Sequence, residues 1–194
     1  MKRIMIATTA VLAVATTALA FSDEGGRRFR EILNGYKEAA APIATTGTGT
    51  FHATISKDET EINYELTFEN LEGDVRQAHI HIGHPQGAGG ITLWLCQTTF
   101  NMNPLPGNST PSCTMDDPMN SRAGRVTGTL TMADVVAQPN ELPNGIAGPA
   151  DWNQLLGLIR AGRTYANVHS AKFGGGEIRS QIDNRDDGDH GGHH

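Results

Sequence analysis

Apolar and polar residues alternate in eight short stretches along the chain, and Gly, Pro and Asn separate these stretches. The stretches are rich in Thr, Val and Ile, and such period-two alternation is typical of strands in an antiparallel sandwich or barrel. The pattern therefore predicts an all-β fold with a closed or double-layered sheet. The expected strands cover residues 29–36, 49–56, 61–71, 76–83, 91–96, 124–132, 163–170 and 176–182.

One stretch has helical rather than strand periodicity. In DWNQLLGLIRAG, residues 151–162, four apolar residues recur at helical spacing, and they are Trp152, Leu155, Leu156 and Ile159. Asp151 could cap the start of this helix and Gly162 could end it. We expect one short helix whose apolar stripe packs on the core.

The N-terminus has the features of a secretory signal. Lys2 and Arg3 precede an uncharged run of small and apolar residues that ends in Ala18-Leu19-Ala20, an A-x-A cleavage site. A retained membrane anchor is the alternative, although no basic cluster follows the run. Cleavage would leave no transmembrane segment, and it predicts a periplasmic or secreted protein.

The expected organisation is a signal peptide at 1–20, a linker at 21–28, a single domain at 29–183 and a tail at 184–194. The tail is polar and rich in Gly, Asp and His, and we expect it to be disordered. Loss of the signal would change the net charge from −6 to −8, because it removes two basic residues and no acidic ones. This charge excludes the basic footprint of a nucleic-acid-binding protein.

Cys96 and Cys113 are the two cysteines of the chain, and they flank a long irregular segment. In an oxidising compartment we expect them to form a disulfide, with a reactive or metal-bound thiol as the alternative. Asn108 lies in the same segment and begins an N-x-S/T pattern, which matters only in a host that glycosylates asparagine.

Three histidines carry the strongest chemical signal. In AHIHIGH, His79 and His81 project from one face of a strand while Ile80 and Ile82 project from the other. His169 lies, by the same alternation, on the non-core face of its strand. If the two strands are neighbours, three imidazoles converge, and neutral imidazole suits Cu, Zn, Ni or Fe. The alternative is that these histidines bond neighbouring loops and bind no metal.

Two further residues are candidates near this group. His84 follows in a glycine-rich turn, where it could serve as a fourth ligand or simply be exposed to solvent. Arg179 could pair with an acidic residue or guide an anion toward a metal, which would place it around the ligands rather than among them. No G-x-S-x-G, H-E-x-x-H, P-loop or paired-Cys zinc motif is present. Enzymatic activity is therefore uncertain and not the favoured interpretation.

Four segments together resemble the CHRD (chordin-type) domain: LNGYKEA, AHIHIG, GRVTGTLT and RTYANVHSAKFGGGEIRSQI, which span about residues 31–183. The resemblance implies a Greek-key β-sandwich or barrel similar to that of Cu/Zn superoxide dismutase. His79 and His81 match the H-x-H pair of that enzyme's copper site, and His169 matches its late copper histidine. The resemblance thus implies copper as the cofactor.

The departures from the dismutase pattern concern the rest of its metal centre. The chain has no counterpart of the bridging imidazole, of the zinc-binding loop or of the long charged loop before Arg179. We therefore expect an exported, non-catalytic copper-binding module for copper storage, delivery or tolerance. One alternative is a metal-free extracytoplasmic module that binds a protein partner or serves adhesion. A third is a copper-only enzyme of the dismutase type.

Overall fold

The computed structural model describes residues 27–39, 41–98, 110–114, 121–136 and 146–183. The predicted signal peptide, nearly all of the predicted linker, Asn108 and the C-terminal tail lie outside these residues.

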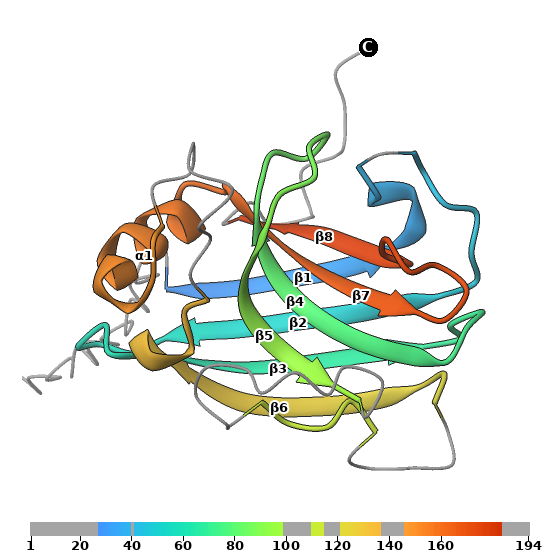
Figure 1. Ribbon diagram of the computed structural model, residues 1–194, viewed down its shortest axis with the longest axis horizontal. Coiled ribbons are helices and arrows are strands. Elements are labelled where there is room, and N and C mark those ends of the chain that lie inside the picture. Colours follow the sequence, from blue (N-terminus) through green and yellow to red (C-terminus); the bar gives the residue numbers. More distant parts are fainter. Residues whose placement is uncertain (1–26, 40, 99–109, 115–120, 137–145, 184–194) are drawn as a thin grey trace, which may run out of the picture.

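Eight strands form one antiparallel sheet, as the alternation predicted (Figure 1). In the order β5-β4-β7-β8-β1-β2-β3-β6, neighbouring strands are hydrogen-bonded to each other. Each predicted strand is present, and most of the boundaries agree within two residues. The strands are β1 (Arg28–Asn34), β2 (Thr48–Ile55), β3 (Glu61–Glu69), β4 (Val75–Ile82), β5 (Ile91–Gln97), β6 (Gly124–Thr131), β7 (Thr164–Ser170) and β8 (Ile178–Ile182).

The sheet curls into a nearly closed barrel with β5 and β6 at its two edges (Figure 1). Strands β5 and β6 contact each other across the seam, so the strands β4 to β7 have the spatial order β7-β4-β5-β6, which is Greek-key connectivity. Two hydrogen bonds reach β5 from the other side of the open seam. The Tyr64 hydroxyl on β3 donates to the Leu95 carbonyl at 2.5 Å, and the N–H of Val136, in the segment after β6, donates to the Thr92 carbonyl at 2.9 Å.

Alternate residues of the strands fill the barrel interior. Phe51, Leu66, Ile80, Leu93 and Val168 are each at most 1% exposed. Burying a side chain of this size contributes roughly 1.5–3 kcal/mol, so this interior is the main source of the fold's stability.

Helix α1 (Trp152–Arg160) covers one end of the barrel with the predicted apolar stripe (Figure 1). Its four apolar residues are buried, and the Trp152 indole donates to the Glu59 carbonyl at 2.6 Å. Asp151 occupies the N-cap position, as expected, but its side chain makes no capping hydrogen bond. A 3-10 turn at Pro149–Asp151 precedes the helix, and the Asp151 carboxylate accepts a hydrogen bond from the Ala147 N–H instead.

The predicted disulfide is present. Cys96 at the end of β5 is bonded to Cys113, with their Cα atoms 4.9 Å apart. Both residues are fully buried, and the Cys113 N–H donates to the Gln97 carbonyl at 3.0 Å. The bond therefore fixes one edge strand of the barrel to the segment 110–114.

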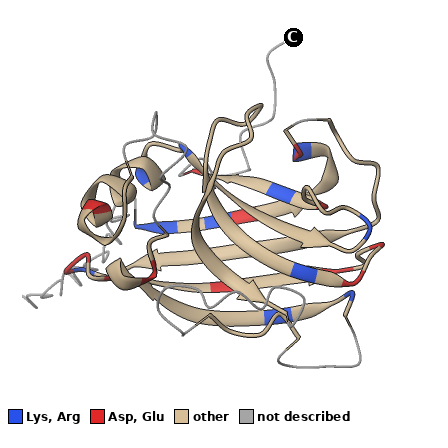
Figure 2. Ribbon diagram, in the orientation of Figure 1, with Lys and Arg blue, Asp and Glu red and all other residues tan. Residues whose placement is uncertain are grey.

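Charged side chains of both signs are interspersed over the described surface (Figure 2). Several form exposed pairs, including Arg125 with Glu65 and Lys172 with Glu72. Such exposed pairs contribute little to stability, because solvent and salt screen the charges. In the described part of the chain, every helix is too short or too polar to cross a membrane.

Candidate metal centre

The three predicted histidines lie on two paired strands. Strands β4 and β7 are antiparallel neighbours, with Gln77 opposite His169, His79 opposite Asn167 and His81 opposite Tyr165. His79 therefore lies next to His81 along its own strand and diagonal to His169 on the partner strand. All three project from the face opposite Ile80 and Val168, as the alternation predicted.

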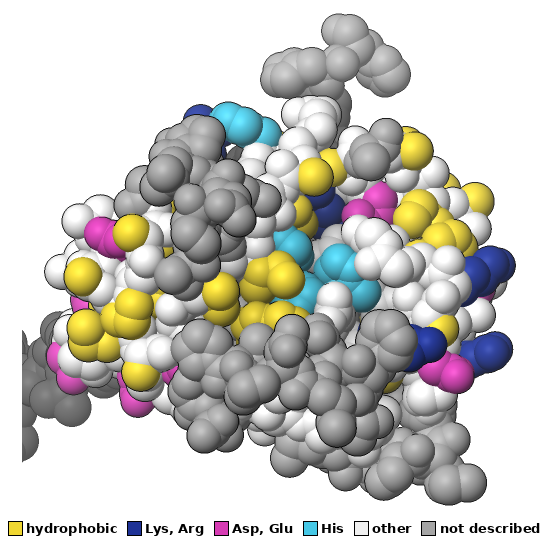
Figure 3. Space-filling view, viewed as in Figure 1, with side chains coloured by type: hydrophobic (Ala, Val, Ile, Leu, Met, Phe, Trp, Pro, Cys, Tyr) yellow, Lys and Arg dark blue, Asp and Glu magenta, His cyan; other side chains and the backbone are white. Residues whose placement is uncertain are grey.

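The imidazoles form a compact group. Ring centroids are 5.3 Å apart for His79 and His81, 4.9 Å for His79 and His169, and 5.9 Å for His81 and His169. Each ring offers a nitrogen, and these three nitrogens lie within 4.8 Å of one another. Figure 3 shows histidine side chains gathered in a hollow on this face of the molecule.

The histidines are buried, although the alternation placed them on the non-core faces of their strands. His79 is fully buried, and His81 and His169 are 7% and 8% exposed. Aromatic rings supply much of the cover. Trp94 on β5 contacts the His79 ring edge-on at 4.2 Å between centroids, and Tyr165 stacks flat on His81 at 4.7 Å.

Main-chain carbonyls orient two of the imidazoles. His81 Nδ1 lies 2.8 Å from the Gly89 carbonyl, and His169 Nδ1 lies 3.0 Å from the Gly174 carbonyl. Because a carbonyl can only accept, each Nδ1 carries the proton and each Nε2 is left with a free lone pair in the neutral ring. The Nε2 atoms of both residues, and both nitrogens of His79, are buried without a hydrogen-bond partner among the described residues.

Burial keeps these imidazoles neutral. The pKa of His81 is lowered to about 4, mainly by desolvation and with a smaller effect of the charges of His169 and Arg179, although the hydrogen bond to Gly89 acts in the opposite direction. Desolvation, together with the other two histidines, holds the pKa of His79 well below its ordinary value. The pKa of His169 is lowered by burial as well. All three are therefore in the form that binds a metal at neutral pH, and no ligand proton must be displaced from the free nitrogens.

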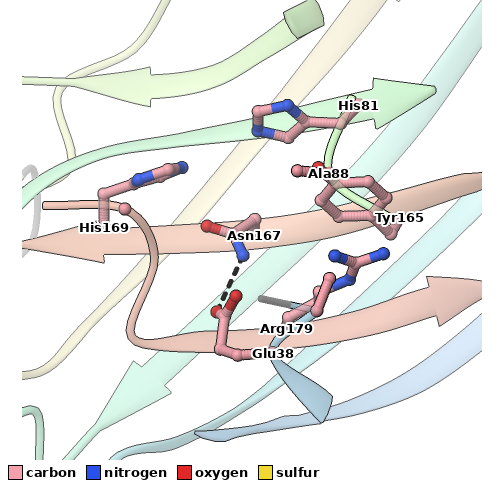
Figure 4. A pocket seen from close by; sticks show the side chains of 9 residues that line it. Glu38, His81, Ala88, Tyr165, Asn167, His169 and Arg179 are labelled. Carbon is pink, nitrogen blue, oxygen red and sulfur yellow. Dashed lines mark hydrogen bonds between the residues drawn. The ribbon is translucent and has the colours of Figure 1, made fainter. Parts of the chain in front are cut away.

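A small cavity of about 60 Å³ adjoins the histidine group (Figure 4). His81, His169 and Asn167 form its buried floor, while the exposed residues Ala88 and Gly175 lie at its rim. The opposite wall carries Glu38 and Arg179.

Glu38 is the acidic group of this wall. Its carboxylate accepts a hydrogen bond from the Asn167 amide at 2.8 Å. Desolvation raises the pKa of the Glu38 carboxyl to about 7, although the bond from Asn167 and the charge of Arg179 act in the opposite direction. This carboxyl therefore changes its charge near neutral pH.

Arg179 lies close to the histidines, and its charge lowers the pKa of His81. Its guanidinium stacks over the Tyr165 ring at 3.3 Å, on a ring that also stacks on His81. One of its nitrogens donates to the His84 and Gly87 carbonyls at 2.8 and 3.0 Å. Arg179 thus fixes the loop that follows β4, in place of the simple ion pair that the sequence suggested.

The structure does not bring His84 into the group. Its side chain is exposed, and its Nδ1 lies 2.9 Å from a guanidinium nitrogen of Arg163. The three histidines of β4 and β7 are the sole cluster of potential metal ligands within the described ranges.

Sequence reasoning missed three neighbours of the group: Glu38, Trp94 and Asn167. The alternation that placed His169 also placed Asn167 on the same strand face, so this signal was present. Trp94 reaches His79 because the pairing of β4 with β5 shifts register on either side of His79 and Ile80. Glu38 arrives from the turn after β1, and no local pattern indicates where that turn lies relative to β7.

The family model described as the CHRD domain matches residues 29–182, which is most of the chain. None of the curated proteins and none of the solved structures compared with the chain matches it.

Proposed function

We propose that this chain, which belongs to the CHRD domain family, is an exported, non-catalytic module that holds one copper ion at His79, His81 and His169. A module of this kind could serve copper storage, delivery or tolerance outside the cytoplasm. Copper is preferred among the imidazole-binding metals because of the likeness of the H-x-H pair and the late histidine to a copper site.

One observation carries the proposal. Four imidazole nitrogens are buried without partners at the meeting point of two strands. An unsatisfied buried polar group costs roughly 1–3 kcal/mol. A metal ion would satisfy three of these lone pairs at once, so the donor set fits copper both in chemistry and in placement.

The surroundings of the group support binding rather than turnover. Carbonyls fix the orientation of His81 and His169, and aromatic rings pack on His79 and His81. Rigid ligands with oriented partners raise metal affinity. The same packing restricts the space in which a substrate could reach the site.

The proposed location outside the cytoplasm draws on two features. The Cys96–Cys113 disulfide is typical of proteins in oxidising compartments. The first twenty residues have the composition of a secretory signal. We propose that the mature protein is periplasmic or secreted.

Titration calorimetry with Cu(II), and with Cu(I) under anaerobic conditions, tests the proposal. The full chain is used with His190, His193 and His194 replaced by Ala, so that tail histidines cannot bind the metal. We expect one tight site. His81→Ala should weaken copper binding at least tenfold, because removing a ligand should cost more affinity than removing the hydrogen-bond partner that orients a ligand, which typically costs tenfold or more. His52→Ala, which changes an exposed histidine of β2, is the matched control.

Equal affinity in the His81→Ala and parent proteins would overturn the copper proposal. A specific protein partner that is retained after exhaustive chelation would then favour the metal-free interaction module.

A further inference from the structure

We infer that the cavity beside the histidines is the route by which the metal ion reaches them, and that Glu38 is the residue that first captures the ion. This inference rests on the proposed metal site and adds an access route and a loading residue to it.

A hollow in the described structure meets two of the histidines. The Nδ1 sides of His81 and His169 are closed by main-chain carbonyls, and Trp94 packs against His79. The cavity of about 60 Å³ is lined by His81 and His169, and exposed residues lie at its rim. A cavity of this size holds a few water molecules, and so it can admit a partly hydrated cation.

The lining of the cavity is rich in acceptors. Besides the two Nε2 atoms, the Asn167 side-chain oxygen is buried and unpartnered. The Glu38 carboxylate receives one hydrogen bond, from Asn167, on its Oε1 atom, and it faces the cavity (Figure 4). A concave site with convergent oxygen and nitrogen acceptors attracts a cation rather than an anion.

Arg179, the one cationic side chain of this wall, does not cancel that preference. Its guanidinium stacks on the Tyr165 ring and donates hydrogen bonds to the His84 and Gly87 carbonyls. The guanidinium is therefore fixed against Tyr165, on the same wall as Glu38, and its hydrogen bonds go to the loop after β4 rather than to the carboxylate (Figure 4). The arrangement leaves the carboxylate as the charged group available to an incoming ion.

Stopped-flow loading with aqueous Cu(II) tests this role. Trp94 packs on His79, so quenching of tryptophan fluorescence reports arrival of the ion at the histidines. The measurement uses the full chain with the three tail histidines replaced, at pH 8 and low ionic strength, where the Glu38 carboxylate is ionised. Glu38→Gln removes the charge but keeps an oxygen that can accept from Asn167.

We expect Glu38→Gln to slow loading of copper by about tenfold, because focused charge raises on-rates by about that factor or more. The release rate should change by less than threefold, because the three histidine ligands are unaltered, so the affinity should fall mainly through slower loading. Glu69→Gln, which removes an exposed carboxylate at the end of β3, should load at the parent rate.

The outcomes separate this inference from the proposed function. If the parent protein shows no copper-dependent quenching and no tight site, the proposed function fails. If the parent binds copper and Glu38→Gln loads at the same rate, the loading role is wrong. If Glu38→Gln instead loses affinity through faster release alone, Glu38 is a metal ligand and the access role is overturned.

Discussion

His81 shows how a single residue acquires its chemistry from its surroundings. Its ring stacks between the histidine group and Tyr165, and its Nδ1 donates to the Gly89 carbonyl. These contacts fix both the tautomer and the direction of Nε2. Burial then lowers its pKa to about 4, so that the lone pair remains available over the whole physiological range.

The depressed pKa of His81 predicts that the metal-free protein loses stability in mild acid. Between pH 6.5 and about 4 the unfolded chain binds a proton at this imidazole and the folded chain does not. The free energy of unfolding therefore falls as the pH is lowered through this window. The loss amounts to a few kcal/mol, at about 1.4 kcal/mol per pKa unit. His79 and His169 act in the same direction.

Glu38 opposes this trend, because its folded pKa of about 7 is above the ordinary value. The stabilisation that Glu38 gives to the folded protein is fully present below about pH 4.5 and is lost as the pH rises through 7. Urea denaturation of the apo protein from pH 8 to pH 4.5 measures the sum. The acid loss should become steeper in Glu38→Gln and shallower in His81→Gln. A slope that His81→Gln leaves unchanged would contradict the assigned burial.

At the scale of elements, the loop between β4 and β5 determines the geometry of the site. Residues 83–90 carry the Gly89 carbonyl that holds His81, and Arg179 and Gln181 anchor the loop from β8 through the His84, Gly87 and Gly83 carbonyls. The Gly89 N–H donates to the Tyr165 hydroxyl at 3.1 Å. The loop therefore links the strand β8 to a metal ligand on β4.

Gly89→Ala should disturb this loop and weaken copper binding. A Cβ at this position would lie 1.6 Å from the Ile82 carbonyl oxygen, so the main chain must move and take the Gly89 carbonyl with it. Loss of such an orienting partner typically costs 10- to 100-fold in metal affinity. A competition titration against a copper chelator measures the change, with near-ultraviolet circular dichroism as a check of the fold.

Gly87→Ala is the matched control in the same loop. A Cβ there would meet its nearest atoms at 3.7 Å, an ordinary contact. We expect its copper affinity to equal that of the parent protein. If Gly89→Ala also binds like the parent, the loop does not position His81.

The sequence predicts the elements well because each carries its own periodic signal. The alternation in AHIHIGH and RTYANVHS also placed His79, His81 and His169 on one kind of face. The alternation does not indicate which residues cover that face. Trp94 depends on a register shift between β4 and β5, and Glu38 depends on the path of the turn after β1. Both are set by tertiary packing, so the alternation alone does not predict that this non-core face is buried.

At the scale of the whole molecule, the Greek-key connectivity creates the site. It places β7 beside β4, although the hairpin to β5, the edge strand β6 and helix α1 intervene in sequence. His169 thereby reaches His79 and His81. One face of β4 and β7 packs on the barrel interior and stabilises the two strands. The opposite face carries the three histidines.

The central claim is that these three histidines bind one metal ion together. Diffraction from copper-soaked crystals of the full chain without tail histidines, collected on both sides of the copper absorption edge, tests it most directly. We predict one anomalous peak among His79, His81 and His169, about 2 Å from a nitrogen of each, as for imidazole ligands in general. Peaks confined to other parts of the surface, with none within this group, would contradict the claim.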